Sequence, residues 1–170
     1  MDVDSFTKDL VDFIDCSKLY AGFEWTLKTK LIGQDEFSWA EFRSVTEGGN
    51  SQLICWEYHI CYSNAYCVPV LFFKATDSLT GRNIPLPDIW SHVPESVRQE
   101  LAVDPWSAIT QQEHPVLNLL YYWIHPCNTK NLLKDLWSLK KGNSIAQWLS
   151  VVGPMVQMPL PMMMVEKLCS

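Results

Sequence analysis

The sequence contains no apolar run near the roughly 20 residues that a membrane-spanning helix needs. It is also poor in basic residues: 13 lysines and arginines stand against 19 aspartates and glutamates, for a net charge of −6. The basic residues are scattered, and Lys140-Lys141 is the longest basic run. Surfaces that bind nucleic acid have clustered lysine and arginine. We therefore expect neither stable membrane insertion nor a nucleic-acid partner.

Signals for targeting and for a modular chain are absent as well. Residues 1–15 are acidic and amphipathic, unlike a secretory signal or a transit peptide. The sequence has no Ser/Gly-rich linker, no internal repeat and no low-complexity run. Its length and its 48% of apolar residues suit one domain with a real core. We expect that domain over residues 1–157, followed by a Met- and Pro-rich tail over 158–170 that packs loosely because it lacks periodicity.

Cysteine occurs six times, without a Cys-x-x-Cys pair. In a chain with no signal peptide, such cysteines indicate reduced thiols in a cytoplasmic protein. Cys55, Cys61 and Cys67 fall at even spacings around His59, so one strand face could present several of them. A zinc site is one interpretation, but this spacing matches no tight-turn ligand pattern. We favour buried thiols and expect neither a metal nor another cofactor.

The hydrophobic pattern predicts an α+β fold with helices against one antiparallel sheet. A helix is expected after a cap at Asp4 or Ser5. Residues 76–105 are rich in proline and are expected to form a loop with one short helix over 94–101. Alternating apolar residues indicate four strands before this loop: residues 23–31, the less regular 37–42, 54–62 and 68–75.

His125-Pro126-Cys127 is the most informative stretch of the sequence. It joins an apolar, strand-like run over residues 119–124 to what reads as the first turn of a helix that stops at Gly142. Unpaired N–H groups and the positive dipole end at a helix N-terminus favour a thiolate over a thiol. Cys127 is therefore the best nucleophile candidate among the six cysteines.

Three motifs follow one another along the chain. They are the strand pair Tyr58-His59-Ile60 and Tyr66 to Phe73, the pair Gln111 to Pro115 and His125-Pro126-Cys127, and Trp148 to Pro154. In this order they resemble the autophagy E2-like conjugating enzymes. The resemblance covers roughly residues 54–154, and a chain of 170 residues suits the shorter kind of family member. It implies the ubiquitin-conjugating fold, an antiparallel sheet with flanking helices.

The resemblance also implies an activity and its partners. An E1-like enzyme, autophagy-related protein 7, would load Cys127 with a ubiquitin-like protein, autophagy-related protein 12. The thioester would then pass to a lysine of autophagy-related protein 5, which the enzyme binds without a separate E3. Strands within residues 23–45 are a candidate docking surface, because an unpaired edge can accept a strand from a partner.

Transfer from a thioester needs a hydrogen-bond donor for the developing oxyanion and help in deprotonating the attacking amine. Ordinary ubiquitin-conjugating enzymes carry an asparagine directly after a His-Pro pair, but here Val116 follows His114-Pro115. Asn118 lies close by, and nothing in the sequence aims it at Cys127. We interpret His114 as a structural residue of a turn and not as a catalyst.

Two side chains can take over the missing role. His125 lies two residues before Cys127, so both side chains project to the same side of an extended segment. Its imidazole could donate to the oxyanion or accept a proton near neutral pH. Tyr66 could supply a phenolic donor from a neighbouring strand. Either residue could instead be structural, with backbone N–H groups of residues 128 and 129 serving the oxyanion.

Two other classes of function are compatible with parts of the sequence. The first is a non-catalytic binding module with the same fold, against which the presence of Cys127 argues. The second is a cysteine hydrolase that pairs Cys127 with His59, His114 or His125. Nucleophile and base usually come from different elements, so the short spacing between His125 and Cys127 makes that pairing awkward.

Overall fold

The structure is a computed structural model that describes residues 1–48, 52–91, 95, 109–126 and 142–169. Cys127 and the helix expected after it lie outside these residues. Within the described ranges, no helix is both long enough and apolar enough to cross a membrane. The elements are α1 (Val3–Ser17), β1 (Thr26–Ile32), β2 (Asp35–Glu47), β3 (Leu53–Ser63), β4 (Val68–Asp77), α2 (Leu86–Ser91), β5 (Ile109–Glu113), β6 (Leu120–Ile124), α6 (Ser144–Val152), the 3-10 helix η2 (Gly153–Val156) and α7 (Met162–Cys169).

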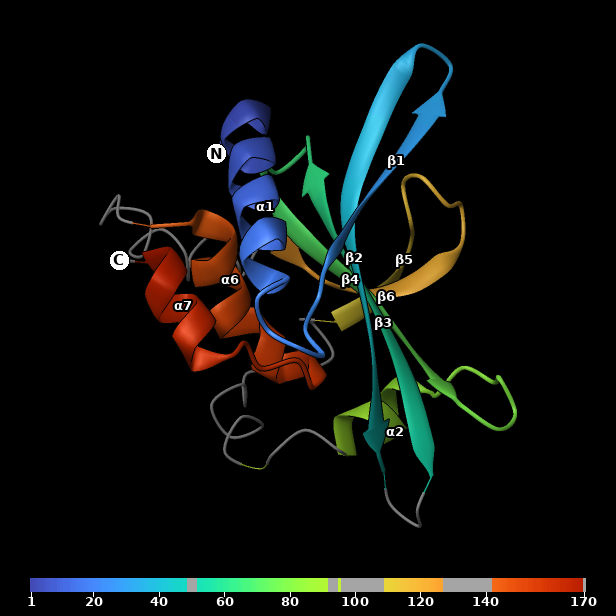
Figure 1. Cartoon of the computed structure of the whole chain (residues 1–170). Helices are drawn as coiled ribbons and strands as arrows, with labels where there is room; N and C mark the ends of the chain where they lie inside the picture. Colours follow the sequence, from blue (N-terminus) through green and yellow to red (C-terminus); the bar gives the residue numbers. More distant parts are fainter. Residues whose placement is uncertain (49–51, 92–94, 96–108, 127–141, 170) are drawn as a thin grey trace.

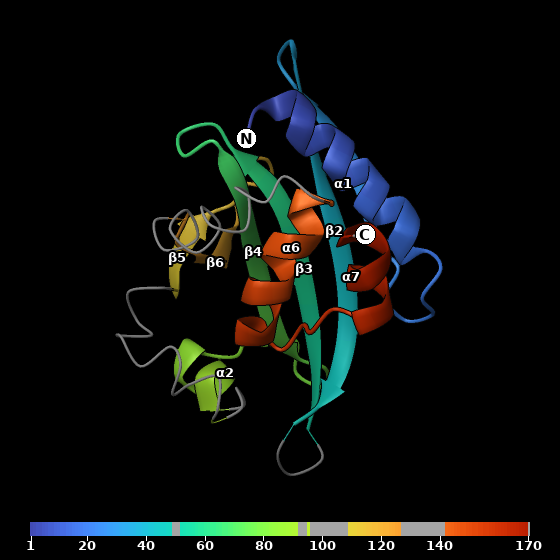
Figure 2. The same ribbon diagram turned by 90° about the vertical axis from the view of Figure 1, so that its left-hand side faces the viewer.

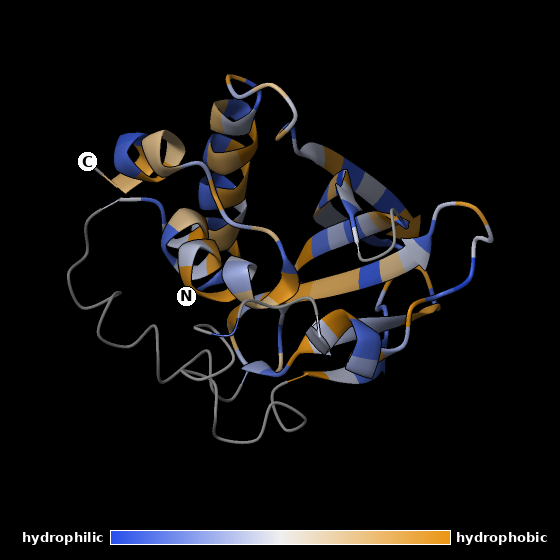
Figure 3. Ribbon diagram, turned by 90° about the horizontal axis from the view of Figure 1, so that it is seen from below, coloured by the Kyte–Doolittle hydropathy of each residue, from blue (hydrophilic) through white to orange (hydrophobic). Residues whose placement is uncertain are grey.

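One antiparallel sheet with the strand order β1-β2-β3-β4-β6-β5 forms the centre of the fold. Helices α1, α6 and α7 lie together on one face of this sheet (Figures 1 and 2). Orange and blue segments alternate along helices and strands in Figure 3, as expected of elements that each bury one face. The predicted α+β class is confirmed.

The main core lies between the sheet and these helices. Ile54, Trp56, Tyr58 and Ile60 follow the two-residue period of β3, and all four are buried, as the alternation predicts. Trp56 stacks on Tyr58 at a ring-centroid distance of 5.9 Å. The buried Tyr58 hydroxyl donates to the backbone oxygen of Val156 at 2.8 Å, which ties β3 to the segment after α6.

The first strand differs from its prediction. Phe23 and Trp25 are buried as the alternation suggests, but they precede the strand, and all seven residues of β1 are exposed. The reason is the register: β2 pairs with β3 only as far as Ala40↔Ile60, whereas β1 and β2 continue to pair beyond that point to Ile32↔Asp35. The β1–β2 hairpin therefore projects past the helix layer (Figure 1).

Two further features differ from the predictions. The N-terminal helix is capped by Asp2, whose carboxylate accepts a hydrogen bond from the Ser5 N–H at 2.8 Å, and not by Asp4 or Ser5. Strand β5 was not predicted at all. Only its first residue, Ile109, is buried, so its polar sequence carries no alternating signal, and pairing with β6 creates the strand.

The C-terminal segment is not loosely packed. Met158 and Met164 are buried in the main core, and α7 occupies residues that were expected to lack structure. The backbone N–H of Asn143 donates to the Leu168 oxygen at 2.8 Å, which joins α7 to the start of α6. The predicted loose tail was therefore wrong, while a domain over residues 1–157 that folds without residues 158–170 stays a prediction.

Candidate active site

Tyr66 and His125, the two side chains proposed from sequence, lie against each other. Their ring centroids are 5.8 Å apart, with the ring planes at 75°. Tyr66 belongs to the turn before β4, rather than to a strand, and His125 follows the last residue of β6. Strands β4 and β6 are neighbours in the sheet, so the strand order brings the two residues together. Cys127, two residues beyond His125, lies outside the described residues.

Trp123 also contacts the His125 ring. The two ring centroids are 5.3 Å apart, and Trp123 also stacks on Phe72 of β4 at 5.8 Å. The Trp123 indole N–H donates to the Thr110 hydroxyl of β5 at 2.6 Å. These contacts thus connect His125 to β6, to β4 and, through the hydrogen bond of Trp123, to β5. The sequence suggested only a core residue at position 123, because strand periodicity does not report a neighbour in a following loop.

Pro126, directly after His125, has a helical backbone conformation and is buried. Proline suits the first position of a helix, because its fixed φ is helical and it has no N–H group to leave unpaired there. The helix expected after Pro126 lies outside the described residues. The catalytic roles of Cys127, His125 and Tyr66 stay predictions.

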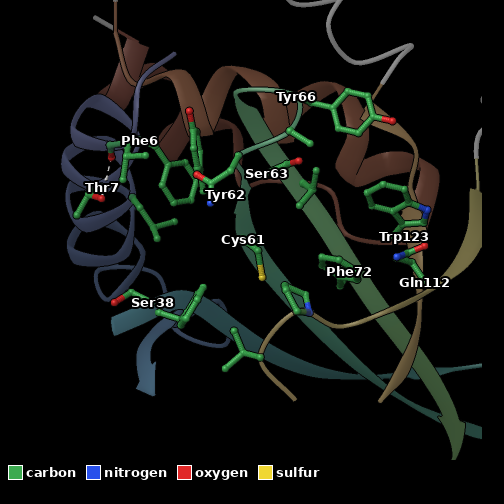
Figure 4. A pocket seen from close by; sticks show the side chains of 18 of the residues that line it. Phe6, Thr7, Ser38, Cys61, Tyr62, Ser63, Tyr66, Phe72, Gln112 and Trp123 are labelled. Carbon is green, nitrogen blue, oxygen red and sulfur yellow. Dashed lines mark hydrogen bonds between the residues drawn. The ribbon is translucent and has the colours of Figure 1, made fainter. Parts of the chain in front are cut away.

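A cavity of about 1100 Å³ opens beside this pair. Tyr66, Trp123 and His125 contribute to its wall, and so do Phe6 and Thr7 of α1 (Figure 4). The cavity is also lined by residues 35–38 of β2 and by residues 61–66, which include the end of β3 and the turn after it. These two segments no longer pair beyond Ala40↔Ile60. Divergence of the two strands therefore creates an open space that reaches His125.

His114 holds the turn between β5 and β6. The N–H groups of Val116 and Leu117 both donate to its Nδ1 at 3.2 Å, so the ring proton resides on Nε2, which donates to Nδ1 of His59 at 3.1 Å. Both imidazoles are fully buried. Burial, and then the nearby His59, lower the pKa of His114 to about 4. His114 is thus a neutral turn residue, as its sequence context suggests.

Asn118 lies far from the candidate site. It adopts a φ of 54° in the turn before β6, and its backbone N–H donates to the His114 oxygen at 3.0 Å. Six residues of mostly extended chain lie between it and His125, which corresponds to roughly 20 Å at the usual rise per residue of a strand. Asn118 is therefore not a neighbour of His125.

The regularly spaced cysteines do not converge. Cys61 is buried with its Sγ 3.5 Å from Nε2 of His114, and burial raises the pKa of its thiol. Cys67 is exposed in the turn after β3, and Cys55 is half-buried. Among the residues that the structure describes, no three His, Cys, Asp or Glu side chains are grouped so that they could hold a metal ion.

Comparisons with known proteins agree with the motifs. The family model "Autophagocytosis associated protein, active-site domain" matches residues 12–163. The human ubiquitin-like-conjugating enzyme ATG10 is 44% identical over 117 residues, which cover 66% of this chain and 53% of that protein. The Arabidopsis thaliana protein of the same name is 34% identical over 119 residues, with 65% and 52% covered. The chain thus spans about half the length of these curated relatives.

A solved structure shares the fold. "Crystal structure of Autophagic E2, Atg10" superposes with a TM-score of 0.58 at 16% identity and covers 89% of this chain and 92% of its own. This likeness confirms the expected E2-like arrangement of an antiparallel sheet with flanking helices. With the family model matched over nearly the whole chain, the protein belongs to the autophagocytosis-associated family that is defined by this active-site domain.

Proposed function

We propose that this protein is an E2-like enzyme of autophagy that carries a ubiquitin-like protein as a thioester on Cys127 and transfers it to a lysine. The observation that carries the proposal is the contact of Tyr66 with His125, two residues before Cys127, in a chain of this family. Two polar side chains beside a predicted thiolate can supply the oxyanion donor and the proton acceptor that the chemistry needs.

The proposed reaction has two steps. Cys127 Sγ attacks the glycyl carbonyl of the E1-bound thioester, a new S–C bond forms, and the E1 thiolate leaves. A lysine amine then attacks the same carbonyl, and collapse of the tetrahedral oxyanion forms the amide and expels the Cys127 thiolate. In our proposal the Tyr66 hydroxyl donates to the oxyanion and the His125 imidazole accepts the amine proton.

The partners follow from the same proposal. Autophagy-related protein 7 acts as the E1-like donor, autophagy-related protein 12 is the ubiquitin-like cargo, and autophagy-related protein 5 is the acceptor, in the cytoplasm. The exposed outer strand β1 supports the predicted docking edge, because all seven of its residues are accessible and its outer side has no strand beside it in the described sheet.

The hydrolase alternative is less well supported. His59 and His114 are both fully buried, and their ring nitrogens already interact with each other and with neighbouring groups. A general base needs a ring nitrogen that can reach the nucleophile or its water. Only His125 remains next to Cys127 in sequence, which suits transfer from a thioester that the E1-like enzyme delivers.

A charging assay tests the proposal. The protein is mixed with the E1-like enzyme, the ubiquitin-like protein and ATP, and wild type, Cys127→Ala and Cys127→Ser are compared on non-reducing gels. We expect a reductant-sensitive adduct on wild type, none on Cys127→Ala, and a reductant-resistant oxyester on Cys127→Ser. If wild type forms no adduct in a tube where the E1-like enzyme charges itself, the transferase proposal is wrong and a binding module becomes the better reading.

A further inference from the structure

The β5–β6 hairpin, which ends at His125, has few backbone ties to the rest of the sheet. Strands β4 and β6 pair at only Phe72↔Trp123 and Phe73↔Tyr122, whereas β3 and β4 pair at ten positions. A hairpin held by so short a ladder needs side-chain contacts to set its position. This matters at the candidate site, because β6 carries the chain directly into His125 and then toward Cys127.

A buried histidine pair supplies the first contact. His114, at the end of β5, donates its Nε2 proton to Nδ1 of His59 on β3 at 3.1 Å. Since Nδ1 of His59 accepts, the proton of His59 resides on Nε2. Both rings are fully buried, so water does not compete for these nitrogens. The turn between β5 and β6 is thereby joined to β3.

A carboxylate cluster supplies the second contact. Nε2 of His59 lies 3.3 Å from Oε1 of Glu57 and 3.5 Å from Oε2 of Glu41. The Tyr121 hydroxyl of β6 donates to the same Glu57 Oε1 at 2.5 Å. Arg43 pairs with both carboxylates, at 2.9 Å to Glu57 and 3.3 Å to Glu41. These distances suit electrostatic attraction, although Nε2 of His59 is not aligned for a hydrogen bond to either carboxylate. The neighbouring His59, and then the Tyr121 hydroxyl, lower the pKa of Glu57 to about 2, so it stays charged.

We propose that His59 is a positioning residue for the transfer reaction. One ring nitrogen holds the β5–β6 turn through His114, and the other holds the carboxylate that receives the Tyr121 hydroxyl of β6. His59 therefore holds the β5–β6 hairpin at two places and sets the position of His125, from which the chain continues to Cys127. Its ring is fully buried, so it acts through the hairpin that it holds. This inference rests on the proposed function, because it concerns the geometry of that reaction.

Substitutions at position 59 separate the two roles of the ring. In His59→Leu the buried Nε2–H of His114 loses its acceptor, which is costly in itself, and Glu57 loses one of its three neighbours but keeps Tyr121 and Arg43. In His59→Gln the amide keeps one acceptor and one donor. Tyr121→Phe removes only the hydroxyl that donates to Glu57, so it tests the second contact and keeps the aromatic ring. Cys55→Ala, on the same strand but outside the cluster, is the matched control.

The experiment measures charging and single-turnover discharge to the acceptor protein separately, on the folded fraction of each variant. We expect His59→Leu to slow discharge about tenfold or more, because small misplacements of reacting groups are costly. Tyr121→Phe should slow it less, and His59→Gln and Cys55→Ala should stay within about threefold of wild type. Long-range ¹H–¹⁵N spectra of the imidazoles should show His114 as the Nε2–H tautomer in wild type and a changed His114 signal in His59→Leu.

The outcomes distinguish this inference from the proposed function. If wild type charges and discharges, and Tyr121→Phe and the His59 variants discharge at the wild-type rate, the positioning role is refuted and the proposed function stands. If wild type fails to charge, the proposed function fails, while the imidazole spectra still test the histidine pair. Should His59→Leu not fold, Tyr121→Phe decides, since a wild-type discharge rate in that variant refutes the inference.

Discussion

The rings of Tyr66 and His125 meet edge to face at a centroid distance of 5.8 Å, although the two residues follow different strands, β3 and β6. Trp123 of β6 also contacts His125, so the imidazole has two aromatic neighbours. Packing of this kind restricts the ring orientations that His125 can adopt. A preorganised donor and acceptor beside the predicted nucleophile is what thioester transfer requires.

Tyr66→Phe removes the hydroxyl and keeps the ring that packs on His125. If the hydroxyl donates to the oxyanion, discharge should fall about 100-fold, the usual effect of losing one such donor, while charging by the E1-like enzyme falls less. Rapid-quench measurement of thioester loss at saturating acceptor gives both rates. Equal discharge by Tyr66→Phe and wild type would leave the residue a purely structural role.

His125→Ala and His125→Asn distinguish proton transfer from hydrogen bonding. We expect the alanine variant to lose about 100-fold in discharge, because both functions of the ring disappear. Asparagine can donate to an oxyanion but cannot take a proton near neutral pH. Its discharge rate should therefore stay well below that of wild type. Recovery of the full rate in His125→Asn would contradict a role as proton acceptor.

Acid should destabilise the protein through His114. Its pKa is lowered from 6.5 to about 4 by burial and by His59, so the folded state binds fewer protons than the unfolded state in this interval. The free energy of unfolding is therefore highest above pH 6.5 and should fall by ~3 kcal/mol as the pH drops to about 4. Urea unfolding at pH 7, 5.5 and 4 measures this change. His114→Gln should show a shallower slope, and identical slopes would refute the assignment.

The three consecutive methionines give a matched test of C-terminal packing. Met164 is 0% exposed in the core and Met163 is 71% exposed on the same helix. Met164→Ala should lower the free energy of unfolding by about 2–5 kcal/mol, because it leaves a cavity. Met163→Ala should change it by less than about 0.5 kcal/mol. Similar effects of both substitutions would show that α7 does not pack as described. Removal of residues 158–170 tests whether residues 1–157 fold by themselves.

Gly142 and Gly33 have similar positive-φ backbone conformations but different surroundings. Their φ values are +84° and +67°, so alanine is unfavourable at either position by about 1–2 kcal/mol. A Cβ on Gly142 would lie 2.5 Å from Cα of Cys169 and 2.8 Å from the Leu168 oxygen, whereas nothing lies within 4 Å of one on Gly33. We expect Gly142→Ala to cost about 1–3 kcal/mol more than Gly33→Ala in thermal or urea unfolding. Equal losses of stability would mean that α7 moves away from the added methyl group at no cost in free energy.

Several features could be predicted from local sequence. The alternation in β3 places Ile54, Trp56, Tyr58 and Ile60 on the face under the helices, and the structure confirms this. The apolar residues before His125 indicate β6 correctly. Three motifs in order were sufficient to predict the family and its fold. Each of these depends on periodicity or spacing along the chain, which the sequence contains directly.

Other features depend on which segments become neighbours. Periodicity in β1 could not reveal that the hairpin extends beyond the helix layer and leaves both faces exposed. The polar residues of β5 form a strand only because β6 lies beside them. Met158 and Met164 are buried because the C-terminal residues 158–169 fold back on α1 and α6, and no local pattern predicts this contact.

Local sequence is enough to identify the nucleophile candidate, the α+β class and the family, because the His-Pro-Cys stretch and the strand alternation are local properties. The contacts of Tyr66 with His125 and of His59 with His114 exist only in the folded domain. The first follows from strand order, because β4 lies beside β6, and the second from the β5–β6 turn, whose His114 reaches His59 of β3. Residues far apart in the chain become neighbours only when the strands assemble into one sheet, and that arrangement is set by the packing of the whole domain.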